Sequence, residues 1–324
     1  MQWHSRSRFA AALIAVILIA LAATAARSQI VGTVRLILPF PPGGPADAMA
    51  RLMAEQIAST GGPTMVVESH PGAGTEIGTE LVSRAAADGN TLAIMSNSFV
   101  VLPHLRHLNY DPLTDFAPIC ELASFPPLIV VNSDSPYHTL ADLIEAARAR
   151  PGALTLGTLG PATSSQMTIE MLKRDAKADI TFVPFAGYTP AIQALLGNQI
   201  TAALADLSTL QGQLQTGKLR ALATTARNRI ALLPDVPTVA ESGYPGFAAE
   251  FFGGVIAPAK TPQQTVAQLI KLFTAAMQSP TIGPKFAALG FLPAGQCGAD
   301  FAAVLRDEYD KYGRIVRDAH LRTE

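Results

Sequence analysis

Glycine-rich loops that follow apolar strands hold the residues best suited to chemistry in this sequence. The first loop reads Leu-Ile-Leu-Pro-Phe-Pro-Pro-Gly-Gly-Pro-Ala-Asp from Leu36 to Asp47. Gly43 and Gly44 lack side chains where a helix is expected to begin, so backbone N–H groups there could donate to a bound anion. The loop contains no Lys or Arg, so backbone dipoles would supply the attraction. The alternative is an ordinary strand-to-helix turn.

The motifs of enzymes and cofactor sites are incomplete in this sequence. Segment 72–78 reads GxGxxxG, one residue longer than the dinucleotide fingerprint, and the acidic residue that would hold a ribose hydroxyl is missing at the required distance. Gly217-Lys218 lacks the Ser or Thr that a phosphate loop needs next, and no GxSxG elbow occurs. His104 and His107 lack nearby acids or cysteines as further metal ligands. We therefore expect no enzyme activity, no cofactor and no metal.

These loops require strands and helices that bring them to one edge of a sheet. Since strands alternate with helical patterns, we expect parallel or mixed sheets with the ligand-capable residues at strand ends. Strands are expected at Val34–Leu38, Met65–Val67, Thr91–Met95, Leu128–Val131, Leu154–Thr158, Ile200–Leu204, Leu219–Thr224 and Phe251–Ala257. Helices are expected around Met49, Met53 and Ile57, and at Leu81–Ala87, Leu140–Ala149, Met167–Leu172, Thr265–Gln278 and Ala299–Ala319.

Two segments of the chain repeat one pattern. Pro39-Phe40 leads to Pro45-Ala46, and Pro184-Phe185 leads to Pro190-Ala191, with the same spacing of six. Each segment joins a strand to a helix across glycine. We interpret them as two facing jaws of one cleft, with Phe40 and Phe185 as apolar walls and N–H groups as donors. The alternative is that both phenylalanines belong to the core, because Phe is commonly buried.

The N-terminus and the overall charge indicate where the protein works. Arg6 and Arg8 precede an apolar run from Phe9 to Ala26, which predicts a secretory signal peptide over residues 1–28. An uncleaved anchor is the alternative, because the run reaches the length of a spanning helix. Losing three of the 24 basic residues with this segment leaves 21 against 25 acidic residues, a net charge of −4. That charge argues against nucleic acid or an anionic membrane surface as partner.

The length and the cysteine count describe the mature chain further. A chain of this size usually divides into two domains of roughly 150 residues each. Cys120 and Cys297 could pair in an oxidising compartment, but the sequence leaves open whether they come within bridging distance. A scaffold dense in disulfides is excluded, since these are the only two cysteines.

Several short motifs follow one another in an order typical of a known family. After the first loop come Pro71-Gly72-Ala73-Gly74, Tyr110-Asp111-Pro112, Val183-Pro184-Phe185-Ala186-Gly187 and Leu233-Pro234-Asp235-Val236-Pro237-Thr238. In this order the sequence resembles the Bug-type solute receptors, the periplasmic binding proteins of tripartite tricarboxylate transporters. The resemblance covers nearly the whole mature chain. No single motif is specific, but the set is.

The resemblance and the loops together nominate ligand-binding residues. In the family the loop before Met167 faces the ligand, which implies roles for Thr158, Thr163 and Ser164, and an acidic or polar residue stands at the position of Asp206. Thr163, Ser164 and Asp206 could instead cap helices. The candidates are Phe40, Pro41, Gly43, Gly44, Asp47, Gly72, Ala73, Gly74, Thr75, Ser96, Asn97, Thr158, Thr163, Ser164, Phe185, Ala186, Gly187 and Asp206. We expect a ligand carboxylate to lie against loops 40–44 and 72–75, held by backbone N–H groups directly or through water.

The resemblance implies a two-domain α/β periplasmic binding protein fold, type II-like, with an interdomain cleft and hinge crossings. We expect residues 29–124 and 235–324 to form one lobe and residues 125–234 the other. The implied function is capture of a small carboxylate-containing solute by a periplasmic monomer, for delivery to the permease subunits of a tripartite tricarboxylate transporter. A receptor that senses the same ligand for a signalling partner is one alternative. An exported enzyme on the same scaffold is another, although the loops offer hydroxyls without a base.

Overall fold

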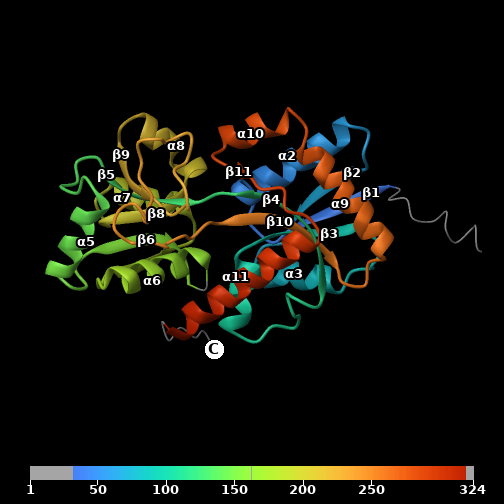
Figure 1. Ribbon diagram of the computed structural model, residues 1–324, viewed down its shortest axis with the longest axis horizontal. Helices are drawn as coiled ribbons and strands as arrows, with labels where there is room; N and C mark the ends of the chain where they lie inside the picture. Colours follow the sequence, from blue (N-terminus) through green and yellow to red (C-terminus); the bar gives the residue numbers. More distant parts are fainter. Residues whose placement is uncertain (1–31, 162, 319–324) are drawn as a thin grey trace, which may run out of the picture.

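The computed structural model describes residues 32–161 and 163–318, which form two lobes, each built on its own β-sheet (Figure 1). We call the lobe that contains both ends of the described chain lobe 1, and the other lobe 2. Lobe 2 is inserted between the fourth and the tenth strand of the chain. The expected signal peptide lies outside the described residues. The expected boundaries at 124/125 and 234/235 stay predictions, because a lobe boundary depends on which residues move together.

Lobe 1 contains a mixed six-stranded sheet. Strand β10 is antiparallel to both β3 and β4, whereas β1 is parallel to β2 and β3. The order is β11-β4-β10-β3-β1-β2. The bounds are β1 Thr33–Leu38, β2 Thr64–Ser69, β3 Thr91–Ser96, β4 Phe116–Ser124, β10 Phe252–Pro258 and β11 Leu292–Pro293. Strands β3 and β10 are buried along nearly their whole length, so their sequences are almost continuously apolar. This pattern made both strands predictable from the sequence.

Helices cover both faces of this sheet (Figure 1). Two adjacent glycines in β10 let helices approach from opposite sides. A Cβ on Gly253 would lie 2.0 Å from Met49 Cε of α2, and one on Gly254 would lie 2.4 Å from Phe301 Cζ of α11. The helices are α2 Pro45–Ser59, α3 Glu76–Ser83, α4 Ser98–Val101, α9 Gln263–Met277, α10 Ile282–Ala288 and α11 Ala299–Asp318, with 3₁₀ turns η1 Ala73–Thr75 and η2 Leu102–His104.

Lobe 2 repeats the scheme with a five-stranded sheet in the order β7-β6-β8-β5-β9. Strand β6 is parallel to β7 and β8, and β5 is antiparallel to β8 and β9. The strands are β5 Pro127–Asn132, β6 Thr155–Leu159, β7 Thr181–Phe185, β8 Ala202–Asp206 and β9 Leu219–Thr224. The helices are α5 Leu140–Ala149, α6 Ser164–Ala176, α7 Tyr188–Leu196 and α8 Leu207–Gln215.

Two crossings and one long helix connect the lobes. The short crossing joins β4 to β5, and residues 225–251 return from β9 to β10. Helix α11 also reaches lobe 2, where Arg174 Nη1 of α6 lies 3.7 Å from Asp318 Oδ2. A disulfide between Cys120 and Cys297 ties β4 to the segment before α11, which decides the pairing that the sequence left open.

Two of the differences from the expected elements have local reasons. The predicted helix at Leu81–Ala87 instead runs from Glu76 to Ser83, because Gly78 serves close packing rather than a loop: a Cβ there would lie 2.8 Å from His70 O and 3.0 Å from Pro39 Cα. Strand β4 was not expected, since Pro118 and Glu121 interrupt its apolar character. Pro118 pairs with Ile256 at an irregularity of the ladder, where a proline is tolerated.

Candidate functional site

A cleft between the lobes forms the candidate site. Its larger part has a volume of about 540 Å³ and a smaller part of about 100 Å³ adjoins it. The two parts share Phe40, Pro45, Ala46, Leu159 and Tyr188, so they form one continuous cleft. Lobe 1 supplies its β1–α2 loop, and lobe 2 supplies its β7–α7 loop. The cleft therefore lies at strand ends of both sheets, where open α/β sheets bind ligands.

Four helices of eight or more residues begin at this cleft, beside the short helix α4. The first residues of α2, α6 and α7 line it, and these residues are Pro45, Ser164 and Tyr188. Helix α8 lines it with its second residue, Ser208. The first N–H groups of a helix have no partner within the helix, and the helix start carries a partial positive charge. Four such starts around one cleft create an environment that favours an anion.

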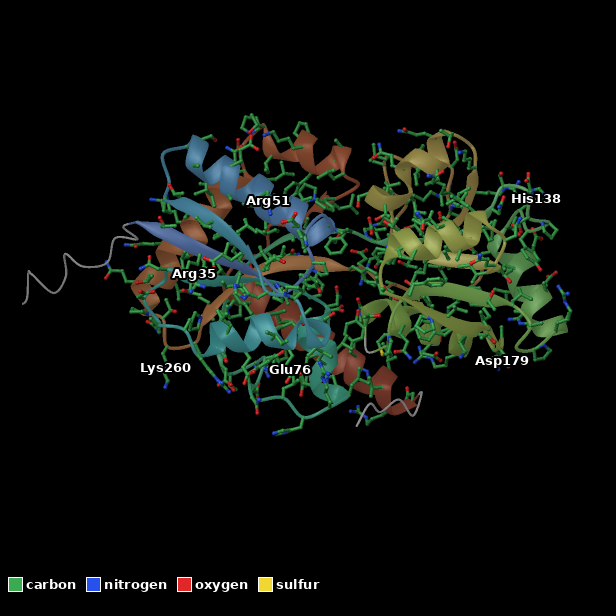
Figure 2. All side chains as sticks on the ribbon, turned by 180° about the vertical axis from the view of Figure 1, so that it is seen from behind. Arg35, Arg51, Glu76, His138, Asp179 and Lys260 are labelled. Carbon is green, nitrogen blue, oxygen red and sulfur yellow. A yellow bond between two sulfur atoms is a disulfide. The ribbon has the colours of Figure 1, made fainter. Side chains whose placement is uncertain are left out.

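No charged side chain is among the described residues that line either part of the cleft. Several titratable side chains lie far from the cleft: His138 and Asp179 are at the far end of lobe 2 and Lys260 is at the far end of lobe 1 (Figure 2). A bound anion would therefore meet N–H groups and hydroxyls rather than a salt-bridge partner.

Two buried carboxylates lie just behind the cleft wall, and each has its own donors. Asp47 Oδ2 accepts from the Gly43 N–H at 2.9 Å, and Asp47 Oδ1 lies 2.9 Å from Arg51 Nε. Asp206 accepts from the Thr209 N–H at 3.0 Å and from the hydroxyls of Thr209 and Ser208. Asp47 thus orders the glycine loop and Asp206 caps α8, so both negative charges are compensated within the protein.

Tyr188 lines both parts of the cleft. Its hydroxyl lies 3.0 Å from Ser165 Oγ, inside lobe 2. Burial, and then the charge of Asp206, raise the pKa of the Tyr188 phenol well above its usual value. The phenol therefore stays neutral, and Tyr188 adds no charge to the cleft.

Asn97 connects the cleft to the second crossing. Its Oδ1 accepts from the Phe252 N–H at 2.9 Å, and its Nδ2 donates to Glu250 O at 3.2 Å and to Tyr312 Oη at 3.1 Å. Asn97 is fully buried, and both its carbonyl oxygen and its NH₂ group are hydrogen-bonded within the protein. We interpret it as a positioning residue that holds the return strand against α4 and α11.

Ten of the sequence-predicted residues line the cleft in the structure. They come from four strand-to-helix connections and from both lobes, and all are uncharged: Phe40, Pro41, Gly43, Gly44, Ser96, Asn97, Thr163, Ser164, Ala186 and Gly187. Thr163 also caps α6, since its hydroxyl accepts from the Gln166 N–H at 3.3 Å.

The second glycine-rich loop lies elsewhere. Gly72, Ala73, Gly74 and Thr75 line neither part of the cleft, because the loop packs against its own lobe. The Arg106 guanidinium donates to Ala73 O and lies 3.1 Å from Glu76 Oε2. The loop is strained, with Ala73 at φ 46° and Thr75 at φ 98°.

Four further candidates sit behind the lining. Thr158 is fully buried and donates its hydroxyl to Leu204 O at 2.7 Å, which ties β6 to β8. Phe185 packs in lobe 2 against Gly157, where a Cβ would lie 2.8 Å from its ring. Asp47 and Asp206 are the two compensated carboxylates described above. In each of these four residues, the side-chain group that we expected to contact the ligand contacts another part of the protein instead.

Some lining residues were not foreseen. Tyr188 directly follows the Val183–Gly187 motif, so extending that motif by one residue would have found it. Ser208 and Thr209 follow Asp206 in the same way. Leu289, Phe291, Phe125 and Phe251 come from the α10–β11 turn and the crossings, and no local pattern marks them.

Two other kinds of site are absent from residues 32–161 and 163–318. This part of the chain contains no group of three or more His, Cys, Asp or Glu that could hold a metal ion. None of its helices is both long and apolar enough to cross a membrane. His104 packs on Tyr309, and its Nε2 lies 2.8 Å from Tyr309 O.

Two α/β lobes around an uncharged cleft lined by helix starts define the class of two-lobed periplasmic binding proteins. Comparison with known proteins identifies the family within this class. Residues 49–321 match the family described as "Tripartite tricarboxylate transporter family receptor" (TctC). This chain belongs to that family, which consists of solute-binding receptors and not of enzymes.

Three solved structures illustrate the similarity. The periplasmic binding protein BugD is 30% identical with a TM-score of 0.81, covering 91% of this chain and 100% of that one. An R. palustris protein solved with adipate is 29% identical with a TM-score of 0.83, covering 91% and 99%. MatC from Rhodopseudomonas palustris, with bound malate, is 29% identical with a TM-score of 0.77, covering 89% and 100%. The expected fold and receptor function are thereby confirmed.

Proposed function

We propose that this receptor captures a small carboxylate-containing solute in the cleft and delivers it to the permease subunits of a tripartite tricarboxylate transporter. One observation carries the proposal: four helix starts surround a cleft whose described lining has no charged side chain. Helix starts attract a carboxylate, whereas a cationic ligand would find no counter-ion in this lining. The relatives solved with adipate and malate hold carboxylates, which supports the same ligand class.

The carboxylate would be held at the starts of α2 and α7. Gly44 and Gly187 precede these helices, and both line the larger part of the cleft. A Cβ on Gly44 would meet no atom within 4 Å, so a ligand can approach the backbone there. Charge-assisted hydrogen bonds contribute roughly 1.5 to 3 kcal/mol each, so two or three would retain a small acid without a salt bridge.

Capture would proceed by closure of the two lobes about the crossings, without chemical change to the solute. We further propose that residues 1–28 direct export, that the mature protein works in the periplasm as a monomer, and that residues 29–124 with 235–324 move against residues 125–234. Small-angle scattering with saturating ligand should show compaction. Mass analysis should return the ligand unchanged, and a converted ligand would favour the enzyme alternative.

A thermal-shift screen tests the ligand class. The panel contains mono-, di- and tricarboxylates, amino acids and nicotinate, and each acid is paired with its uncharged amide. An acid at 100 times its dissociation constant should stabilise the protein by about 2.7 kcal/mol, and its amide should not. Stabilisation by amides or amines with none by any carboxylate would overturn the proposal.

A further inference from the structure

The side chains of the larger part of the cleft are mostly apolar or already hydrogen-bonded. Apolar contacts come from Phe40, Leu159, Leu289 and Phe291, with several prolines between them. Both lobes contribute, since Leu159 ends β6 and Phe291 precedes β11. This surface resembles the apolar wall of a small-molecule site, in which a few polar groups fix orientation.

The polar side chains in this part are committed to internal partners, with one exception. Ser208 and Thr209 donate their hydroxyls to Asp206. The Tyr188 hydroxyl lies 3.0 Å from that of Ser165. Among the described side chains lining the larger part, only the Thr189 hydroxyl has no internal hydrogen-bond partner. Backbone donors at the helix starts remain, but these are the groups that the carboxylate requires.

We propose that the ligand is a carboxylic acid whose body, where it lies in the larger part of the cleft, is apolar, a plain hydrocarbon chain or ring without hydroxyl groups. This inference rests on the proposed function, which supplies the carboxylate. A ligand hydroxyl buried without a partner costs about 1 to 3 kcal/mol, so a polyhydroxylated body is disfavoured in the larger part of the cleft. The serine hydroxyls of Ser96, Ser98 and Ser164 line the smaller part instead. Family membership does not decide the question, because relatives were solved both with adipate, which has no hydroxyl, and with malate, which has one.

Matched pairs of acids with one carbon skeleton test the inference. Adipate is compared with galactarate, its tetrahydroxy analogue, and cyclohexanecarboxylate with quinate, its tetrahydroxy analogue. Calorimetry should find at least one unhydroxylated acid bound on the order of 100-fold more tightly than its partner. Equal or tighter binding of the hydroxylated acid, or binding by neither member of either pair, overturns the inference. The proposed function has its own test: it is wrong if no acid of the wider carboxylate panel binds.

Variants of two partly exposed leucines locate the apolar body. Leu289→Asn should weaken binding of the preferred acid about tenfold and leave the affinity for its hydroxylated partner equal or higher. Leu232→Asn is the matched control, because Leu232 is an exposed leucine of lobe 2 that lines neither part of the cleft. Circular dichroism confirms folding of both. An unchanged ratio between the two acids in folded Leu289→Asn would overturn the inference.

Discussion

The two loops that face each other across the cleft have similar sequences but different roles. In lobe 1, Phe40 follows β1 and lines both parts of the cleft. In lobe 2, Phe185 ends β7, but its ring packs against Gly157 inside the lobe, and Tyr188 provides the cleft wall instead. The difference shows that a repeated motif fixes where the backbone turns and leaves the direction of each side chain to its surroundings.

The loops also differ in how their donors are arranged. In lobe 1 the Gly43 N–H donates to Asp47, which lies four residues further along the chain in the first turn of α2. In lobe 2 no acid follows Gly187 within α7, and the nearby acid Asp206 belongs to the end of β8. Lobe 1 therefore uses a local carboxylate to order its loop, whereas the nearby carboxylate of lobe 2 caps α8 instead.

The largest effect is expected when a side chain at Gly44 blocks the ligand from the backbone N–H groups. Gly44→Val places a side chain in open cleft space without backbone strain, since Gly44 has φ −89°. Carboxylate affinity should fall by at least about 100-fold, or about 2.7 kcal/mol. Gly187→Val should act alike if both loops hold the ligand. Gly283→Val, on α10 outside the lining, is the control, and normal affinity in folded Gly44→Val would place the site elsewhere.

A second prediction concerns Glu121 of β4, the strand that precedes the short crossing. Burial, and then the charges of Glu250 and Glu308, raise the pKa of Glu121 to about 7. Below pH 4.5 the Glu121 carboxyl is protonated in both the folded and the unfolded protein, and between pH 4.5 and about 7 it ionises only in the unfolded protein. The free energy of unfolding therefore falls as the pH rises through this range and levels off above pH 7. Glu121→Gln should therefore gain roughly 2 kcal/mol over wild type at pH 8 and nothing at pH 4. Equal differences at both pH values would contradict this.

A third prediction separates the two aromatic roles. Tyr188→Leu should weaken ligand binding about tenfold, because the ring forms part of the cleft wall. Phe185→Leu should leave the affinity nearly unchanged and lower the free energy of unfolding by about 1 kcal/mol. Calorimetry and denaturant unfolding measure the two quantities. A loss of affinity in Phe185→Leu with none in Tyr188→Leu would reverse the assignment.

The smallest effect is expected at the loop-ordering acid. Asp47→Asn weakens the bond to the Gly43 N–H and removes the ion pair with Arg51, whose side chain is 59% exposed. The free energy of unfolding should fall by less than about 1 kcal/mol, and carboxylate affinity should change by no more than a few-fold. A double-mutant cycle with Arg51→Gln separates the two contributions. A large loss of affinity would mean that Asp47 contacts the ligand itself.

The sequence by itself determined the strand-to-helix turns and the α/β class. Apolar runs, glycines and helix starts are local signals, so they suffice to place loop 40–44, the segment 96–97 and the Val183–Gly187 motif at strand ends. The ordered set of motifs also identified the family. Boundaries were less accurate where a residue served packing, as Gly78 does within α3.

Only the tertiary structure decided which of these groups reach the ligand. Thr158 and Asp206 carry suitable polar atoms, but these atoms already have partners in the protein. The Thr158 hydroxyl donates to Leu204 O, and the Asp206 carboxylate caps α8. Phe291 enters the cleft from a turn that lies far beyond the β7–α7 loop in the chain. The physical reason is that a side chain's direction and its free hydrogen-bonding capacity depend on neighbours distant in sequence, whereas a turn or a helix start depends on residues adjacent to it.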